Sequence, residues 1–198
     1  MTASAQAAER IAIPRTLCLT GTRILLRPAR PADVVQRYVD WLNDPDINRY
    51  LETRFEVQTI NTTSDYVRDA ATDRDQVLLA ICLREDDRHI GNLKIGRVNW
   101  RHRHSDISLF IGEKPLWVHG YAAEAIALAC DFAFAVLKLH KLRAGVYADN
   151  AGSIRAFEKC GFQREGRLRE HVLEDGAYTD VVLLGRLATD KVPAILRR

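Results

Sequence analysis

Long hydrophobic runs are absent from this sequence. The most apolar segment, Tyr121–Leu139, is interrupted by Glu124 and Asp131, whereas a membrane-spanning helix needs about 20 predominantly apolar residues. The segment Met1–Arg10 carries no basic stretch that leads into an apolar run of signal-peptide length. These absences predict a soluble cytoplasmic protein without a membrane partner.

Closely spaced cysteine pairs are absent as well. All four cysteines fall in apolar surroundings and form no CxxC pair: Cys18, Cys82, Cys130 and Cys160. We expect buried, reduced thiols rather than disulfides or zinc ligands. The loop Arg101–His104 has two histidines, but its side chains alternate in direction and no carboxylate or cysteine stands at ligand spacing. The sequence therefore predicts no metal site.

An excess of charge of one sign is also missing. The chain has 29 Lys and Arg against 26 Asp and Glu, a formal net charge of +3 that is spread along its length. A nucleic-acid-binding domain would need a clustered basic face. The sequence therefore predicts no nucleic-acid partner.

Apolar residues are plentiful enough for one full-sized core. Of 198 residues, 47% are hydrophobic and 28% are charged, which is ordinary for one compact domain. The first residues are polar and Ala-rich, as in a disordered terminus. We predict a flexible lead-in over residues 1–16, a single domain over 17–190 and a tail over 191–198.

Strand-like runs recur along the chain. They are: Thr22–Arg27, Gln76–Arg84, His89–Val98, Ser105–Ile111, Lys141–Tyr147, Gln163–Leu173 and Ala177–Leu187. The turn Glu174–Gly176 joins the last two as a hairpin.

Helical periodicity separates some of these runs. The predicted helices are: one from Pro31 to Asp44, one from Thr62–Ser64 that buries Tyr66, Val67 and Ala70, one over Gly120–Lys138, and one over Ala151–Cys160. The strand, helix, strand step around Gly120–Lys138 predicts a parallel crossover. The predicted fold class is α/β, of the α+β kind, with a mixed, mostly antiparallel sheet of about seven strands.

The segment from Ile107 to Ala125 carries the most chemical information. A strand runs into a loop and the loop into a helix, and the small residues Gly120 and Ala122 stand at the helix start. Successive backbone N–H groups at the positive end of a helix dipole can bind a pyrophosphate there.

This helix start resembles a known family signature. Trp117–Ala125 reads Trp-Val-His-Gly-Tyr-Ala-Ala-Glu-Ala and is similar to the acetyl-CoA signature of the GNAT acetyltransferases, in the branch that reads Trp-Gly-Lys-Gly-Tyr-Ala-x-Glu-Ala. Val118 stands where that branch usually has glycine, and His119 where lysine is common. Gly120 and Ala122 are retained.

Two further segments extend the resemblance over about residues 20–187. Asn150–Phe162 is similar to the family element Asn-x-x-Ser-x-x-x-Tyr/Phe-x-Lys-x-Gly-Phe, and Glu165–Asp180 resembles the last hairpin of the ribosomal-protein, spermidine and nucleotide-sugar acetyltransferases (the RimJ/RimL-like branch). The resemblance implies a GNAT fold, with a sheet splayed between its fourth and fifth strands and helices on both faces. It also implies acetyl-CoA as cosubstrate and direct acetyl transfer to a primary amine.

The resemblance also implies which residues hold acetyl-CoA. Backbone groups of the fourth strand would pair with the pantetheine arm like an added strand, the loop would bind the pyrophosphate, and the helix after the Asn motif would supply the remaining contacts. These residues are: Leu109, Phe110, Ile111, Trp117, Val118, His119, Gly120, Tyr121, Ala122, Asn150, Ser153, Phe157 and Lys159.

Direct transfer needs a neutral amine, an acceptor for its proton and N–H groups that stabilise the oxyanion. Glu170 is the first candidate for the base, by resemblance to the ribosomal-protein branch, and Asp106 and His104 follow. Phe157 stands where many relatives have a tyrosine that acts as the general acid toward the leaving thiolate. Ser153 is then the nearest hydroxyl by pattern for that role.

In relatives the loop after the first helix borders the acceptor site. The resemblance implies substrate contacts in this loop by: Trp41, Asn43, Asp46 and Tyr50. Acidic residues such as Asp44 and Glu52 would attract an amine, and Arg49 and Arg54 a phosphate. This mixture favours a small-molecule amine, specifically an amino sugar or its nucleotide adduct.

Other interpretations stay open at this point. One is an N-terminal protein acetyltransferase of the ribosomal type. Another is a catalytically silent acyl-CoA-binding module, which the departures at Val118 and Phe157 would suit. A homodimer that pairs through the last strands is one option for the oligomeric state.

Overall fold

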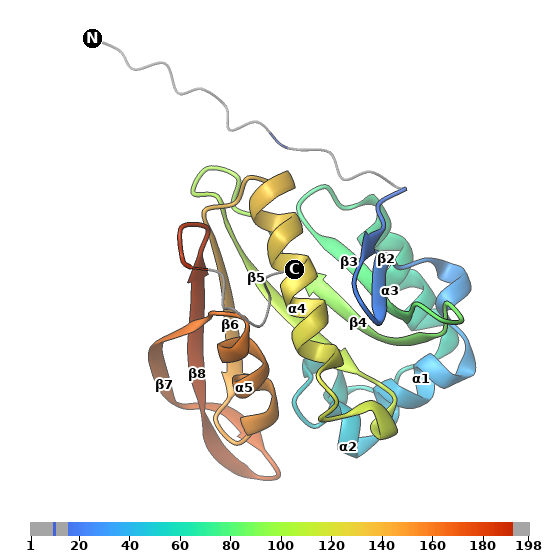
Figure 1. The fold of residues 1–198 in the computed structure, drawn as a ribbon. Helices are drawn as coiled ribbons and strands as arrows, with labels where there is room; N and C mark the ends of the chain where they lie inside the picture. The colour runs from blue at the N-terminus through green and yellow to red at the C-terminus, as the bar shows by residue number, and fades with distance from the viewer. Residues whose placement is uncertain (1–9, 11–15, 192–198) are drawn as a thin grey trace.

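The computed structural model describes Arg10 and residues 16–191, and one eight-stranded sheet forms its centre (Figure 1). The strands lie in the order β1-β2-β3-β4-β5-β6-β8-β7. Their bounds are: β1 Leu19–Thr20, β2 Ile24–Pro28, β3 Val77–Leu83, β4 His89–Ile95, β5 His104–Ile111, β6 Lys141–Tyr147, β7 Gln163–Glu174 and β8 Ala177–Leu187. Neighbouring strands pair antiparallel except β5 and β6, which are parallel. The predicted mixed, mostly antiparallel sheet is confirmed. The two-residue strand β1 was not predicted, because it is too short to show an alternating apolar pattern.

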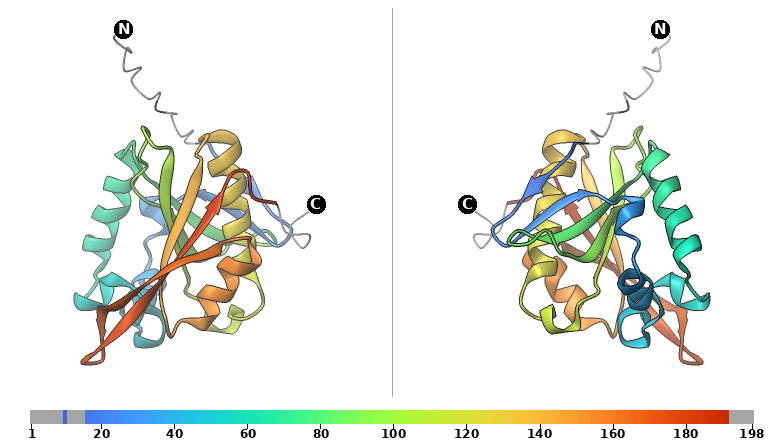
Figure 2. Two further views of the ribbon diagram at one scale, coloured as in Figure 1. Left: turned by 90° about the vertical axis from the view of Figure 1, so that its left-hand side faces the viewer. Right: turned by 90° about the vertical axis from the view of Figure 1, so that its right-hand side faces the viewer.

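The helices lie in two layers. They are: α1 Gln36–Asn43, α2 Pro45–Asn48, α3 Ile60–Thr72, α4 Tyr121–Asp131 and α5 Ala151–Lys159, with 3-10 turns η1 Pro31–Asp33, η2 Glu52–Phe55 and η3 Lys114–Leu116 and a π-helical turn η4 Phe132–Val136. Figure 2 shows α4 and α5 on one face of the sheet and α1, α2 and α3 on the other. Helices on both faces were predicted and are confirmed.

Strand β3 shows how the sequence builds both layers. All seven of its side chains are buried. Because side chains alternate along a strand, Leu79 and Ile81 join the core beneath α4, whereas Leu78 and Ala80 join the core beneath α1 and α3. A continuous apolar run is therefore what a strand covered on both faces requires.

The sheet splays between β5 and β6. Only His104–Asp106 pairs with Lys141–Arg143, and Ile107–Ile111 continues past β6 without a partner on that side. The splay between the fourth and fifth predicted strands is thus confirmed. It leaves one backbone edge of β5 open along the half of the strand that leads to α4.

Two turns follow from the local chemistry of the chain. The β7-β8 hairpin turns at Asp175 and Gly176, whose φ angles of 48° and 83° are both positive, as a two-residue type I′ turn requires. Helix α5 ends before Gly161, whose φ of 85° matches the predicted left-handed cap.

Several predictions of detail were wrong. Cys18 is exposed, since it precedes the short edge strand β1, while the other three cysteines are buried and all four are free. Tyr66 is 44% exposed and its hydroxyl accepts a hydrogen bond from Lys94. Helix α3 begins at Ile60 rather than at 62–64, because the Thr59 side chain caps it.

The predicted single helix over 120–138 was also wrong in one respect, because α4 gives way to a π-helical turn at Phe132. Most of the predicted lead-in and tail lie outside the described residues. Within the described part of the chain, no helix is long and apolar enough to cross a membrane.

Candidate active site

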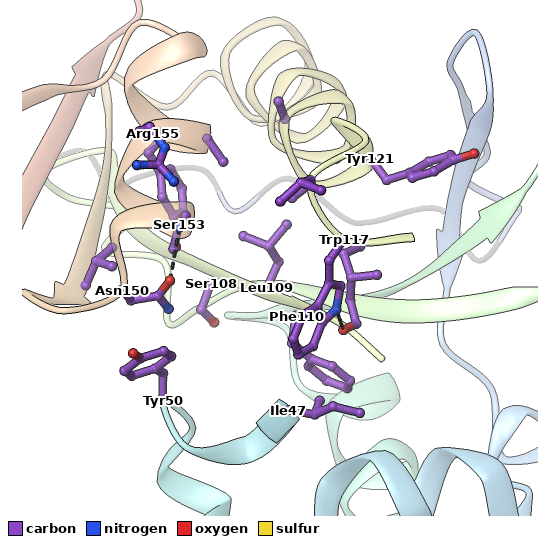
Figure 3. Close-up of a pocket in the computed structure, with 18 of the residues that line it drawn as sticks. Ile47, Tyr50, Ser108, Leu109, Phe110, Trp117, Tyr121, Asn150, Ser153 and Arg155 are labelled. Carbon is purple, nitrogen blue, oxygen red and sulfur yellow. Dashed lines mark hydrogen bonds between the residues drawn. The ribbon is translucent and has the colours of Figure 1, made fainter. Parts of the chain in front are cut away.

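A cavity of about 540 Å³ opens where β5 and β6 diverge (Figure 3). Its walls come from β5, the loop that leads to α4, the first turn of α4, the end of β6, helix α5 and the α2 region. In Figure 3, Ile47 and Tyr50 of the α2 region lie opposite Asn150, Ser153 and Arg155 of α5. The cavity therefore joins two of the three segments that carried the family resemblance, Trp117–Ala125 and Asn150–Phe162.

The loop before α4 adopts left-handed backbone at two positions. Gly120, the residue that caps α4, has a φ of 86°, and Val118 has a φ of 61°. Positive φ is strained for a β-branched residue, whereas glycine adopts it without steric cost. Val118 thus holds the conformation that glycine favours, and its side chain is 99% exposed.

Arg23 and Glu124 fasten this loop to the sheet. Glu124 accepts the Arg23 backbone N–H at 2.8 Å and its Nε at 3.0 Å, and Arg23 also donates to the carbonyl oxygen of His119 at 2.8 Å. Burial would raise the pKa of Glu124, but these bonds outweigh it and hold the pKa below its usual value. Glu124 is therefore a charged anchor for the first turn of α4.

The other side of the loop is tied to β5. The indole Nε1 of Trp117 donates to the carbonyl oxygen of Ile111 at 2.7 Å. Leu109, Phe110 and Ile111 line the cavity, as do Trp117 and the residues of the first turn of α4. These predicted site residues are thus brought together.

Helix α5 forms the opposite wall. Asn150 caps the helix, since its Oδ1 accepts the N–H of Ser153 at 3.0 Å. Phe157 is buried against Phe162, with ring centroids 5.0 Å apart, and still contributes to the cavity wall together with Ser153 and Lys159. Asn150 lines the cavity as well.

Some predicted residues do not line the cavity. The structure places Trp41 in the core, 5% exposed, where its ring packs against His89 at 5.2 Å. Asn43 bonds to the backbone of Val39 and Gln58. Trp41 lies on the buried face of α1, and the exposed Asn43 is engaged by the Gln58 backbone, so only the later part of the predicted acceptor loop reaches the cavity.

That later part contains Asp46 and Tyr50, which both line the cavity. Asp46 accepts a hydrogen bond from Lys114 Nζ at 2.6 Å. His119 is not among the lining residues, and its carbonyl oxygen faces Arg23 instead.

The residues predicted as bases lie outside the cavity wall. Glu170 sits in an irregular stretch of β7 with a φ of 48°, and its N–H donates to Asp180 Oδ1 at 2.7 Å. Asp106 is engaged by Arg143, with the Nε of Arg143 3.0 Å from its Oδ1. His104 is likewise absent from the wall. Their catalytic roles stay predictions.

Two ionisable residues of the cavity wall, Tyr147 and Arg155, were not predicted from the sequence. Tyr147 ends β6, is 7% exposed and donates from its hydroxyl to Glu52 Oε1 at 2.8 Å. Arg155 lies one helical turn before Lys159 on α5, and both line the cavity. The i, i+4 spacing of these two cations was the signal for Arg155, whereas nothing local to Tyr147 indicates its partner.

Thiol chemistry finds little support in these surroundings. Burial raises the pKa of Cys160 to about 12, and its Sγ donates to the carbonyl oxygen of Ala123, so the thiolate that a nucleophile requires is disfavoured. Among the described residues, no three His, Cys, Asp or Glu side chains gather as metal ligands.

Comparison with known proteins gives the family. A model described as an acetyltransferase (GNAT) domain matches residues 23–163. The chain belongs to the GNAT acetyltransferase family. It is accordingly an acetyl-CoA-dependent N-acetyltransferase, which confirms the predicted enzyme class and cosubstrate and replaces the interpretation as a silent binding module.

Similar proteins include enzymes that are named for an acceptor. The spermidine N(1)-acetyltransferase of Escherichia coli K12 is 28% identical over 163 residues, which cover 80% of this chain and 83% of that one. The Vibrio cholerae spermidine N(1)-acetyltransferase is 33% identical over 92 residues, 46% of this chain and 53% of that one. A relative without a named acceptor, the uncharacterised N-acetyltransferase p20 of Bacillus licheniformis, is 27% identical over 158 residues, 79% of this chain and 86% of that one.

A solved structure of spermidine N-acetyltransferase from Vibrio cholerae in complex with CoA and spermine superposes with a TM-score of 0.77. The match covers 86% of this chain and 98% of that chain at 23% identity. At this identity the likeness demonstrates a shared fold.

Proposed function

We propose that the protein transfers the acetyl group of acetyl-CoA to the primary amine of a small molecule, with an amino sugar as the favoured acceptor class. The single observation that carries this proposal is the cavity at the splay. It is continuous from the loop of Val118 and Gly120 to the acceptor side at Asp46 and Tyr50.

Acetyl-CoA fits the wall that faces α4 and α5. The open edge of β5 would pair with the pantetheine arm through Leu109, Phe110 and Ile111, and the left-handed loop would bind the pyrophosphate with N–H groups at the start of α4. Lys159 and Arg155 would meet the adenosine phosphates. Ser153 would approach the thioester.

The acceptor side of the cavity has paired charges. Lys114 pairs with both Asp44 and Asp46, at 2.8 and 2.6 Å. Arg49 donates to Glu174 Oε1 at 2.8 Å. Arg54 donates to the carbonyl oxygen of Leu173 at 2.9 Å. Because both arginines are engaged, neither is free to bind a nucleotide phosphate, and an amino sugar without a nucleotide is the better fit of the two predicted acceptors.

A polyamine is the second candidate. Relatives named spermidine N(1)-acetyltransferases favour it, and Glu52, with a side chain 76% exposed at the acceptor side, would attract a second ammonium group. Against it, the paired groups around Arg49 and Arg54 leave little net negative charge.

The test is thiol release from acetyl-CoA across amino sugars, nucleotide amino sugars, polyamines and short peptides, with calorimetric CoA binding in parallel. Preferential turnover of free amino sugars is the expected result. Preference for polyamines would select the second candidate, and turnover of peptides alone would establish an N-terminal protein acetyltransferase. The Gly120→Trp variant is the control, since the indole would fill the loop and abolish CoA binding.

A further inference from the structure

The reaction needs a proton acceptor near the amine, and the predicted bases do not line the cavity. The ionisable side chains of the wall are: Asp46, Tyr50, Tyr121, Tyr147, Arg155 and Lys159. Asp46 is bound to Lys114, and the two cations of α5 have no lone pair to accept a proton. The tyrosines remain.

Tyr147 differs from the other tyrosines by its partner. Its hydroxyl donates to Glu52 Oε1 at 2.8 Å, and the Glu52 side chain is 76% exposed. Arg54 Nη1 lies 3.9 Å from the same Glu52 oxygen, a looser pairing than the 2.6 Å contact between Lys114 and Asp46. Tyr121 lies under the Arg23 guanidinium at the phosphate loop, 4.4 Å from the ring centre. Tyr147 is therefore the wall residue that connects the cavity to a carboxylate and, through it, to water.

The surroundings of Tyr147 suit such a connection. From η2 it faces Glu52 and Arg54, whose guanidinium carbon lies 5.2 Å from the ring centre, and the Tyr50 ring packs edge-on at 5.6 Å. Its pairing partner on β8 is the apolar Val181. Burial and the hydrogen bond to Glu52 raise the pKa of Tyr147, so the phenol stays protonated at neutral pH and keeps a proton to pass on.

We infer that Tyr147 and Glu52 form a proton relay for the acceptor, an inference that rests on the proposed function only in requiring a primary amine. The bound ammonium gives a proton to the Tyr147 oxygen as the Tyr147 hydroxyl proton passes to Glu52, which exchanges it with solvent. The neutral nitrogen then forms the N–C bond, the C–S bond breaks, and the sulfur keeps the electron pair. The second nitrogen proton ends on the CoA thiol, so atoms and charge balance.

The test is the pH profile of kcat/KM for Tyr147→Phe and Glu52→Gln, with the amine that the wild-type enzyme acetylates fastest. Glu52→Gln can still accept the phenol hydrogen bond but takes up no proton. Both variants should lose about 100-fold near pH 7, a typical contribution of general base catalysis. As the pH rises, a larger fraction of the free amine is already neutral in solution. The loss of kcat/KM in both variants should therefore shrink by about tenfold per pH unit.

Matched controls separate the relay from a structural role. Tyr66 lies on α3, and its hydroxyl accepts a hydrogen bond from Lys94 at 3.1 Å. Tyr66→Phe therefore also removes a hydrogen-bonded hydroxyl, and this variant should behave as wild type. CoA binding by calorimetry should be unchanged in all three variants. A loss that is constant across pH, or wild-type activity of Glu52→Gln beside an impaired Tyr147→Phe, would overturn the relay. A different preferred acceptor would change only the proposed function.

Discussion

Arg23 and Glu124 lie 101 positions apart and form the anchor of the phosphate loop. Glu124 accepts both the backbone N–H and the side-chain Nε of Arg23, at 2.8 and 3.0 Å. The same guanidinium reaches the carbonyl oxygen of His119. Arg23, the residue just before β2, thus holds the loop through His119 and the first turn of α4 through Glu124.

Replacing Arg23 with alanine should weaken CoA binding by about tenfold, or 1.4 kcal/mol. The physical reason is that a loop no longer held in its binding conformation must be ordered when the ligand binds. Calorimetric titration with CoA measures the change. Arg68→Ala is the control, because Arg68 pairs with Asp65 on the exposed side of α3. An unchanged Kd for Arg23→Ala would contradict the anchoring role.

Replacing Val118 with glycine should stabilise the fold by roughly 1 kcal/mol. A strained φ at a non-glycine residue costs about 1–3 kcal/mol, and the substitution relieves this strain. Glycine also has more conformational freedom in the unfolded chain, which offsets part of the stabilisation. Val118 is 99% exposed, so little packing is lost. Urea unfolding measures the difference. The control is Val57→Gly, because Val57 is 84% exposed but does not have a positive φ. This substitution relieves no strain and should destabilise the protein.

Replacing Arg49 with alanine should lower the free energy of unfolding more than replacing its partner Glu174 with alanine. The Glu174 side chain is 9% exposed and its Oε2 is buried without a hydrogen-bond partner, whereas Arg49 is 49% exposed. Arg49→Ala leaves a buried carboxylate without its partner and should cost about 2 kcal/mol. Glu174→Ala leaves a guanidinium that can turn to water and should cost less. Chemical denaturation of both variants and the double variant tests this order, and equal costs would count against it.

His89 should make stability depend on pH. Burial lowers the pKa of His89, and the nearby Asp33 charge and the Gly91 carbonyl only partly offset it. An unfolded histidine titrates near pH 6.5, so this contribution is fully present above about pH 6.5 and is lost as the pH falls toward the lower folded pKa.

The variant His89→Phe should therefore show a shallower fall in the free energy of unfolding as the pH drops below about 6.5, by up to roughly 1.4 kcal/mol per pH unit. The slope is the measurement, since the substitution also alters packing against Tyr38 and Trp41. His171→Asn, at an exposed position on β7, is the control. An identical slope in wild type and His89→Phe would refute the assignment.

Much of the architecture could be predicted from the sequence because it follows from neighbours in the chain. Alternation and helical periodicity predicted β6 over Lys141–Tyr147 with its correct bounds, and the Asp175-Gly176 turn defined the last hairpin. Gly120 at the start of α4 and the Asn150 cap were likewise local signals. Backbone preferences and hydrogen bonds within a few residues determine such features.

Only the tertiary structure decided which side chains meet in the cavity. Trp41 and Asp46 stand on one predicted acceptor segment, yet Trp41 packs into the core and Asp46 reaches the cavity. Glu170 matched a family position, but on β7 its backbone N–H donates to Asp180 of β8, and Glu170 does not line the cavity.

The pair of Tyr147 and Glu52, 95 positions apart, has no local signature at all. The sequence by itself determined most of the elements, the loop and the family, because short-range geometry and motif spacing encode them. The packing of distant segments across the splayed sheet determined the partners.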